Sequence, residues 1–522
     1  MSSPLSESPY RRRAFLLVAV VLILRLIYVA LFAVNPAGDE AYYWDWGRQL
    51  DYGYYSKPPF IAWLYAFVDW VGGGSLFAIR ASAVILGTLS LLILFRLTED
   101  LFDAKTAWFA LLLGITAPAN SVLSFFLTID APLVMCWSLA LFAFHRYLSG
   151  KGGTGYLWLL FFSLAIGHLS KQMMMIFPVL AILFLLIHRE TRPLLRRGGL
   201  WAALLGSFLA LTPPLVWNAQ NDWITFEHTS HHFEVIEEEG NVVLERAEDF
   251  LSFIGTQLGV IGPAVGVILL SVSLVALPQL RRLSRSFRFL LVFGALPLAG
   301  MLLLALRQGL QPNWPAVFYI SGMALTAAWY RGMIPLSWPP KSWQKLFPVA
   351  IAMNLVFVTY FYAGPLIFQI AGKPGHTADP NRRLLGHDLV AAEVQKIRET
   401  IPDATDLFLI ASGHRDVVSH LAFCLPDQPH VYHFSDQPGI RSQYDLWPNP
   451  SEAGFNGKDG LIVVPNSSAM PAALKKHFEE TEKVGEFEVP FGWDRSRKYS
   501  VFRGVSLTGW PHLSPPDSSK IH

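Results

Sequence analysis

Residues 35–64 read NPAGDEAYYWDWGRQLDYGYYSKPPFIAWL, and this stretch decides how the rest of the chain can fold. It carries four carboxylates, two cations and many aromatic side chains, yet it directly follows an apolar run from Ala14 to Val34. That run is longer than the apolar core of a signal peptide and ends without a small-residue cleavage pattern, so we expect a retained helix. A polar insert next to apolar helices is expensive inside a bilayer. We therefore expect residues 35–75 to form a loop at a membrane surface.

The composition points the same way. The 522 residues are 52% hydrophobic and only 15% charged, whereas about a quarter of a soluble chain is normally charged. The 17 Trp and 37 Phe residues can supply aromatic belts at the two membrane interfaces. The formal net charge of +2 comes without a basic domain that would favour nucleic acid. Two cysteines, Cys136 and Cys424, are too few for a disulfide framework, and we expect unpaired thiols.

Stretches of about 20 mainly apolar residues, the length that crosses a bilayer, predict eleven membrane spans. Their approximate bounds are 14–34, 76–96, 106–122, 130–148, 156–170, 172–188, 199–217, 250–279, 287–306, 314–330 and 346–370. The loops on the side of the N-terminus hold 18 Lys and Arg residues, and the other loops hold 5. The positive-inside rule then predicts a cytoplasmic N-terminus, an external first loop and, because the number of spans is odd, an external C-terminal part. Arg25 lies within the first span, where we expect it to pair with a carboxylate of the helix bundle.

The composition changes near residue 371. Long apolar runs stop, and short strand-like segments at 406–412, 430–435 and 460–466 alternate with helix-like segments at 389–400 and 470–483. This alternation predicts a small α/β domain over 371–507, after a transmembrane domain over 1–370. The tail at 508–522, rich in Pro and Ser, is expected to be disordered. No internal repeat and no nucleotide-binding loop is evident, so a soluble nucleotide donor has no recognisable cradle.

The first loop offers candidate reactive groups. Asp39 and Glu40 come just after the first span, where a carboxylate can act as the base that takes a proton from an attacking hydroxyl, or can simply be solvated. Lys57 follows Tyr55 in the segment YYSKPPF, and the two prolines hold it on an extended backbone. A cation fixed in this way is suited to a phosphate, although it could also reach out to lipid head groups.

The segments GDEAYYWDWGRQL and YYSKPPFIAWL resemble membrane glycosyltransferases of the protein O-mannosyltransferase group, including bacterial enzymes that move aminoarabinose or other sugars onto lipid A. The resemblance implies the glycosyltransferase-C architecture, with many membrane helices, a large first external loop and a polyprenyl-phosphate-linked sugar as donor. It makes Asp39 the catalytic carboxylate and Glu40 its acidic neighbour. Lys57 matches a lysine that faces the donor phosphate, in a segment where many relatives carry another residue.

Other matches extend over roughly the first 330 residues. Asp130, in TIDAP, resembles a second acidic motif, and it could also cap the start of a helix. Lys171, in HLSKQ, resembles a family lysine and would be a second phosphate contact, or an ordinary loop lysine. Arg307 and the following QPNWPAV resemble a PNWP element, which makes Arg307 a third phosphate contact and Asn313 a sugar or backbone contact. A proline-ended loop without a binding role is the alternative.

The segment WNAQNDWITFEHTSHH begins at Trp217 and resembles a recurrent segment of bacterial relatives. Trp217 and Asn218 could contact a sugar, one by stacking and the other by hydrogen bonds. The three histidines of this segment and the nearby Glu234 have a spacing that would also allow a metal site. The expected chemistry needs neither a metal nor another cofactor when lysines cover the phosphate.

The chain is therefore expected to be an inverting glycosyltransferase of the bacterial inner membrane, with Asp39 as base and Lys57, Lys171 and Arg307 around the donor phosphate. The expected acceptor is lipid A or lipopolysaccharide, followed by protein hydroxyls and then by a cell-wall polymer. A lipid or sugar transporter would share the spans but would more often show pseudo-symmetric halves. A receptor or assembly scaffold would carry its function in the C-terminal domain instead of the first loop.

Overall fold

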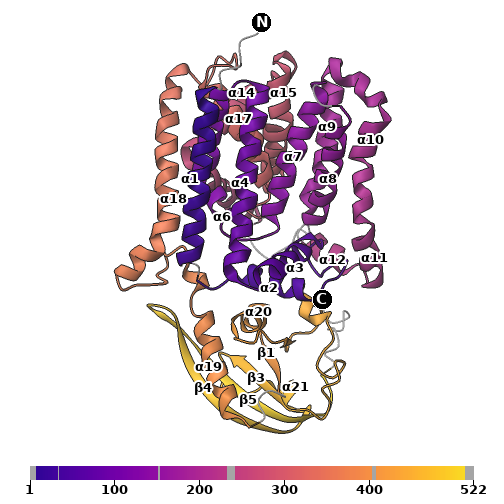
Figure 1. The fold of residues 1–522 in the computed structure, drawn as a ribbon, viewed down its shortest axis with the longest axis vertical. Helices are drawn as coiled ribbons and strands as arrows, with labels where there is room; N and C mark the ends of the chain where they lie inside the picture. The colour runs from indigo at the N-terminus through magenta and orange to yellow at the C-terminus, as the bar shows by residue number, and fades with distance from the viewer. Residues whose placement is uncertain (1–7, 33, 151–152, 232–241, 403–406, 512–522) are drawn as a thin grey trace. The chain divides into compact units, whose positions relative to one another are not determined.

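The computed structural model describes residues 8–32, 34–150, 153–231, 242–402 and 407–511 (Figure 1). Most of the tail that we predicted to be disordered therefore lies outside the described residues. The chain divides into two compact units. The first unit consists of Met1–Phe32, Lys57–Ile61 and Gly72–Phe361, and the second consists of Ala33–Ser56, Ala62–Val71 and Tyr362–His522. Most of the polar first loop thus belongs to the same unit as the C-terminal residues.

The first unit is helical, and in Figure 1 its long helices α1, α4 and α7 run side by side. Its helices are α1 (Pro9–Phe32), α4 (Leu76–Leu101), α5 (Ala104–Thr116), α6 (Pro118–Leu123), α7 (Asp130–Leu148), α8 (Gly155–Ser170), α9 (Ile176–Ile187), α10 (Gly198–Leu204), α11 (Thr212–Gln220), α12 (Ile224–His231), α13 (Val242–Ile261), α14 (Pro263–Ala276), α15 (Arg285–Leu290), α16 (Leu296–Ala305) and α17 (Tyr319–Tyr330). Helix α18 (Leu346–Ile370) begins in this unit, and α3 (Phe60–Gly72) has residues in both units.

Six helical segments of the described chain are long and apolar enough to cross a membrane. They are Pro9–Phe32, Leu76–Leu101, Asp130–Leu148, Gly198–Gln220, Arg285–Ala305 and Lys341–Ile370. Four other predicted spans correspond to apolar helices of 10–17 residues, which are shorter than a bilayer requires. The protein is an integral membrane protein by these helices, while the number of eleven crossings stays a prediction.

The predicted span at 250–279 is wrong as a single helix. Helices α13 and α14 meet there at an angle of 110°. Gly262 has φ +95°, a left-handed conformation that favours glycine, and Pro263 follows at the start of α14. Because proline lacks an N–H and clashes with the preceding turn, a helix cannot run straight through this position. The result is either a broken span or a re-entrant loop.

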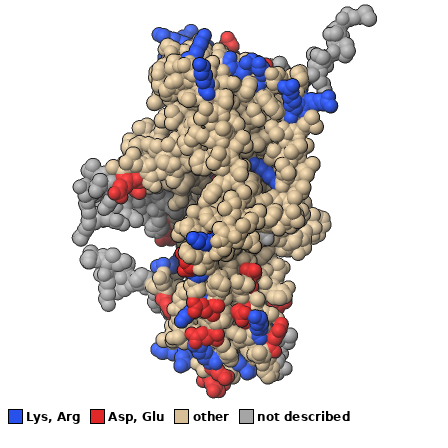
Figure 2. All heavy atoms as spheres, turned by 90° about the vertical axis from the view of Figure 1, so that its left-hand side faces the viewer, with Lys and Arg blue, Asp and Glu red and all other residues tan. Residues whose placement is uncertain are grey.

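Aromatic and aliphatic side chains fill the interior of the helical unit, with Trp137, Phe144 and Phe177 fully buried. Figure 2 shows a broad band of the helical surface with few charged side chains, as expected of a surface that faces lipid. Arg25 is buried, but our expectation of a carboxylate partner was wrong. Its guanidinium donates to Ser124 Oγ and Asn120 Oδ1, both at 2.8 Å. Neutral acceptors on α6 and just after it thus satisfy the charge.

The second unit contains a five-stranded sheet in the order β2-β1-β3-β5-β4. Its strands are β1 (Phe408–Ser412), β2 (Val431–Phe434), β3 (Gly460–Pro465), β4 (Phe478–Gly492) and β5 (Arg495–Leu507). Strand β1 pairs in parallel with β2 and β3, and β3, β5 and β4 are antiparallel. Helix α19 (His387–Thr400) and helix α20 (Arg415–Cys424) pack against the sheet, while α21 (Ala472–Lys475) is a single turn. The three segments predicted as strands form β1, β2 and β3.

The helix predicted at 470–483 is wrong over most of its length, because the segment ends in a strand. Only Ala472–Lys475 is helical, and β4 begins at Phe478. Strand β4 pairs with β5 along its length, for example Glu480 with Val505. The Glu and Lys residues of this segment favour a helix locally, but the ladder of backbone hydrogen bonds with β5 outweighs that preference.

Helix α2 (Gly38–Arg48) carries the acidic motif and packs on α20 within the second unit. Its Trp44 and Trp46 are buried, and Trp44 contacts Phe423 edge to face at 4.9 Å. A fully buried helix face of aromatic side chains contributes several kcal/mol of hydrophobic stabilisation, at about 1.5–3 kcal/mol for each large side chain. The first loop is therefore ordered by residues more than 370 positions away in the sequence.

Candidate active site

In the helical unit, three of the candidate residues meet. Lys171 Nζ donates to Asp130 Oδ1 at 2.7 Å, and Asn313 Nδ2 donates to Asp130 Oδ2 at 2.6 Å. Asp130 is the first residue of α7, Lys171 ends α8, and Asn313 lies in the loop before α17. The side chains of Asp130 and Lys171 are only 5% and 10% exposed. The three motifs thus form one buried polar cluster, in which the acid offsets the charge of the lysine.

The other two predicted phosphate contacts also belong to the helical unit. Lys57 is half-buried and stands directly before Pro58 and Pro59, both buried, at the entrance to α3. Arg307 is exposed at the end of α16, where its backbone N–H bonds to Leu304 O at 2.9 Å. Their roles at a phosphate stay predictions.

Trp217 and Asn218 lie at the end of α11, and both are buried. The amide of Asn218 is committed to the backbone, because Nδ2 donates to Pro214 O at 2.8 Å and Oδ1 accepts from Thr225 N at 3.2 Å. These bonds fix the turn between α11 and α12 and use one N–H and the oxygen of the amide, while a sugar contact by Trp217 and Asn218 stays a prediction. His232 and Glu234 of the possible metal site lie outside the described residues. Within the described part of the chain, no group of three or more His, Cys, Asp or Glu residues is arranged to hold a metal ion.

In the second unit, Asp39 lies in the first turn of α2 and its side chain is 50% exposed. Arg415, the first residue of α20, donates from Nη2 to Asp39 Oδ1 at 3.0 Å. The same guanidinium stacks on the ring of Tyr42, 4.3 Å from its centroid. Burial alone would lower the pKa of Arg415, but Asp39 and the neighbouring tyrosines outweigh it and raise that pKa. The arginine therefore stays charged and orients a carboxylate that solvent can reach.

Glu40 is fully buried, unlike Asp39. Its Oε2 accepts from the backbone N–H of Ala37 at 2.9 Å, one arm of a capping arrangement at the start of α2. This contact holds the turn that presents Asp39. The backbone N–H of Tyr55 donates to Gln443 Oε1 at 2.7 Å, so the middle of the first loop is also held within this unit.

Further buried contacts fix α2 on the C-terminal residues. The Tyr42 hydroxyl accepts from Gln443 N at 2.6 Å, and Tyr444 donates to Asp45 Oδ2 at 2.8 Å. Burial raises the pKa of Asp45 to about 6, with Arg48 and the Tyr444 hydroxyl working against that rise. Burial also raises the pKa of Tyr42 to about 12, so its hydroxyl stays protonated. The helix that carries Asp39 is thus held rigidly, which a reacting group requires.

Arg415 is a candidate functional residue that the sequence reasoning missed. A signal was present: Arg415 follows the buried strand segment FLIAS by only two residues, at the carboxyl end of a strand that lies between two parallel neighbours. Ligands of open α/β sheets commonly bind at this end. What the sequence could not indicate was the partner, because Asp39 lies 376 residues earlier.

The chain is similar in sequence to known glycosyltransferases. Residues 56–217 match the family described as dolichyl-phosphate-mannose-protein mannosyltransferase, a range that includes Lys57, Asp130 and Lys171 but not Asp39. The chain is 26% identical over 441 residues to the lipid A galacturonosyltransferase RgtD of Rhizobium johnstonii, covering 83% of this chain and 87% of that protein.

Solved structures show the same fold. ArnT from Cupriavidus metallidurans aligns with TM-scores of 0.59 in its apo state and 0.60 when bound to undecaprenyl phosphate. Both alignments have 16% sequence identity and cover 97% of this chain and 100% of the other. An oligosaccharyltransferase of Archaeoglobus fulgidus aligns with a TM-score of 0.50 and 13% identity, over 88% of this chain and 70% of that one.

The fold and these similarities together indicate a polytopic membrane glycosyltransferase. The chain resembles the glycosyltransferase-C family, and one of the relatives to which it is similar is a transferase that acts on lipid A. The family predicted from GDEAYYWDW and YYSKPPF is confirmed. The expectation of unpaired thiols also holds, because Cys136 and Cys424 are both free.

Proposed function

We propose that the protein transfers a sugar from a polyprenyl-phosphate-linked donor to lipid A or lipopolysaccharide, with inversion at the anomeric carbon. The observation that carries this proposal is the similarity to a lipid A galacturonosyltransferase over 83% of the chain. The likeness in fold to a transferase that binds undecaprenyl phosphate supports the donor class. The transferred sugar is a hexose or a pentose.

Asp39 is proposed as the general base. It is half exposed, it lies at a helix N-terminus, which favours negative charge, and Arg415 orients it. The acceptor hydroxyl gives its proton to Asp39 while its oxygen forms the new bond to the anomeric carbon. The bond from that carbon to the phosphate oxygen breaks on the opposite face, and the polyprenyl phosphate leaves with the electron pair. Glu40 supports the base through the start of α2.

The departing phosphate gains negative charge, and we assign Lys57, Lys171 and Arg307 to offset it. Fixed cations of this kind lower the barrier because they interact more strongly with the transition state than with the bound donor. Lys171 would act from within its pair with Asp130, while Asn313 keeps the carboxylate turned toward the lysine. The chemistry requires neither a metal nor another cofactor.

The proposed location is the bacterial inner membrane, with the N-terminus in the cytoplasm and the C-terminal residues in the periplasm. The bias of 18 against 5 Lys and Arg residues between alternate loops supports this orientation. A protein hydroxyl is the second candidate acceptor, because the matching family is described as a protein mannosyltransferase.

The test is a transfer assay with purified protein in lipid nanodiscs, a radiolabelled undecaprenyl-phosphate sugar, and lipid A or an unstructured Ser- and Thr-rich protein as acceptor. Asp39→Asn should lower the rate of transfer to lipid A by about 10²–10⁴-fold, the usual contribution of a general base. The matched control is Asp436→Asn, which changes an exposed carboxylate of the same unit. Full activity of Asp39→Asn, or labelling of the protein acceptor alone, would overturn the proposal.

A further inference from the structure

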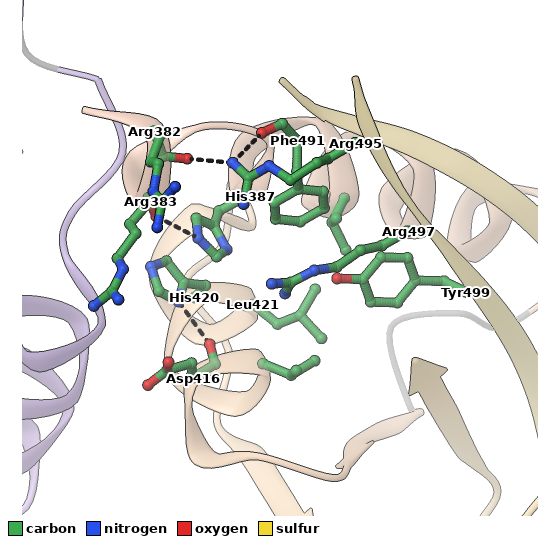
Figure 3. A pocket seen from close by; sticks show the side chains of 12 residues that line it. Arg382, Arg383, His387, Asp416, His420, Leu421, Phe491, Arg495, Arg497 and Tyr499 are labelled. Carbon is green, nitrogen blue, oxygen red and sulfur yellow. Dashed lines mark hydrogen bonds between the residues drawn. The ribbon is translucent and has the colours of Figure 1, made fainter. Parts of the chain in front are cut away.

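A polar cavity lies wholly within the second unit, on the side of α20 that carries Asp416 and His420. Its volume is about 390 Å³, within the range of sites for small organic ligands and larger than a single bound ion needs. The lining comes from α19, α20, β4, β5 and the turn before α19. Figure 3 shows the side chains of these elements converging on one space. None of the functions proposed above uses this cavity.

The lining is strongly cationic. It includes four arginines, at 382, 383, 495 and 497, and a single carboxylate, that of Asp416. Arg495 is occupied, since Nη2 donates to the backbone oxygens of Arg382 at 3.1 Å and Phe491 at 2.9 Å. Arg497 Cζ lies over the ring of Phe491, 4.5 Å from the centroid, and Figure 3 shows its guanidinium pointing toward the two histidines. Stacking leaves the edge of a guanidinium open, and that edge binds phosphate in a bidentate manner.

Two stacked imidazole rings line one side of the cavity. His387 and His420 are parallel within 9°, and their ring centroids are 3.5 Å apart. Burial, together with the neighbouring His420 and Arg497, lowers the pKa of His387 to about 3, so the ring is neutral. His387 Nε2 lies 3.3 Å from Arg383 O and must donate to it, which leaves Nδ1 as an acceptor. A neutral acceptor of this kind suits a sugar hydroxyl.

One side of the cavity is formed by a residue next to Arg415, which holds the proposed base, Asp39. Asp416 lines the cavity, and Arg415, the residue before it, holds Asp39. A Cβ placed on Gly38 would fall 2.7 Å from Asp416 Oδ1, so the start of α2 lies directly against this carboxylate. His420 Nε2 also lies 3.0 Å from Pro36 O. A ligand in the cavity would therefore contact Asp416 at the start of α20, next to the arginine that positions Asp39.

We propose that this cavity binds the phosphorylated sugar headgroup of the acceptor glycolipid. The phosphate lies on the edge of Arg497 beside Arg382, the sugar hydroxyls face His387 and Asp416, and the free hydroxyl is directed toward Asp39. This assignment rests on the proposed function and adds the acceptor class, a sugar phosphomonoester carried on a lipid. A soluble sugar phosphate has the same chemistry and is the competing occupant.

Binding is measured apart from transfer, so that the two proposals can fail separately. The Asp39→Asn protein in nanodiscs is titrated with diphosphorylated lipid A, with the same lipid after phosphatase treatment, and with glucosamine 1-phosphate. Removing the phosphates should weaken lipid A binding at least tenfold, and Arg497→Ala should abolish that difference. Equal binding of both lipids overturns the assignment, and so does glucosamine 1-phosphate binding as tightly as lipid A, which would mark a soluble ligand. Absence of transfer with phosphate-selective binding intact would instead count against the proposed function alone.

Kinetics give a second readout in protein with Asp39 intact. Arg497→Ala should raise the KM for phosphorylated acceptor about tenfold, with kcat and donor KM within twofold, and Arg497→Lys should recover part of the loss. Arg441→Ala, an exposed arginine outside the cavity, is the matched control and should change nothing. Should Arg497→Ala fail to fold, Arg382→Ala serves in its place, since its guanidinium makes only a 3.3 Å bond to Thr377 O. A loss confined to kcat, or an equal loss with dephosphorylated acceptor, refutes the proposal.

Discussion

Replacing Lys171 by Met tests whether the buried cluster of the helical unit is structural, functional or both. The substitution keeps the volume and removes the charge 2.7 Å from Asp130, whose side chain is 5% exposed. Breaking one partner of a buried pair costs about 3–5 kcal/mol, because the remaining charge is left without compensation. An unfolding entropy of about 2.1 cal/mol/K per residue, applied to the whole chain, converts this loss into a fall of about 3–5 °C in melting temperature.

The second variant, Asp130→Asn with Lys171→Met, removes both charges and keeps an amide that can accept from Asn313. Because replacing a whole buried pair is often neutral, its melting temperature should return to within about 1–2 °C of the wild type. The assay is thermal unfolding in one detergent, followed by transfer measured well below the melting temperature. Recovered stability with transfer still reduced at least tenfold assigns Lys171 to the donor phosphate. Recovered stability with full transfer refutes that role, and an unchanged melting temperature for Lys171→Met alone refutes the buried pair.

Three further outcomes are expected. Arg415→Ala should lower transfer at least tenfold while costing less than about 1 kcal/mol of stability, because its pair with Asp39 is partly exposed. Activity assays and melting curves on the same samples check this contrast. Arg415→Lys should restore part of the activity. Burial holds the pKa of Asp45 near 6, above its unfolded value of 3.8, so the stability that its protonated form contributes is complete below pH 4 and lost as the pH rises through 6. Asp45→Asn should therefore raise the melting temperature at pH 7.5 and leave it almost unchanged at pH 4, and an equal shift at both pH values would contradict this. Asn218→Ala should destabilise by about 1–3 kcal/mol, since it leaves Pro214 O and Thr225 N without their side-chain partner; a neutral result would show that water replaces the amide.

The sequence predicted elements well where a property of neighbouring residues decides the outcome. The run before Asn35 is apolar enough to be a membrane helix on its own, and α1 covers it from Pro9 to Phe32. The sequence-based prediction was wrong where the folded chain sets the local structure. Residues 478–483 look helical until β5 is placed beside them. The break between α13 and α14 had a local signal in Gly262 and Pro263 that our prediction missed, but its angle of 110° is set by the folded chain.

The same division holds for the candidate site. The residue types of the first loop identified Asp39 and Lys57, because charged groups in a polar insert between membrane helices are costly unless they are used. Asp130, Lys171 and Asn313 were identified by their resemblance to motifs of the family. Those motifs did not indicate which of these side chains contact one another. Lys171 could equally have faced solvent, and Asn218 could equally have faced a sugar.

By itself the sequence determined that this protein lies in a membrane, which segments are apolar helices and which family it resembles, since hydrophobicity and motif chemistry are local and add along the chain. Only the tertiary structure decided that Arg415 holds Asp39, that Asp130 offsets Lys171, and that four arginines surround a cavity in the second unit. The physical reason is that electrostatic and hydrogen-bond energies depend on distances of a few ångströms, and folding sets those distances between residues that the chain keeps far apart.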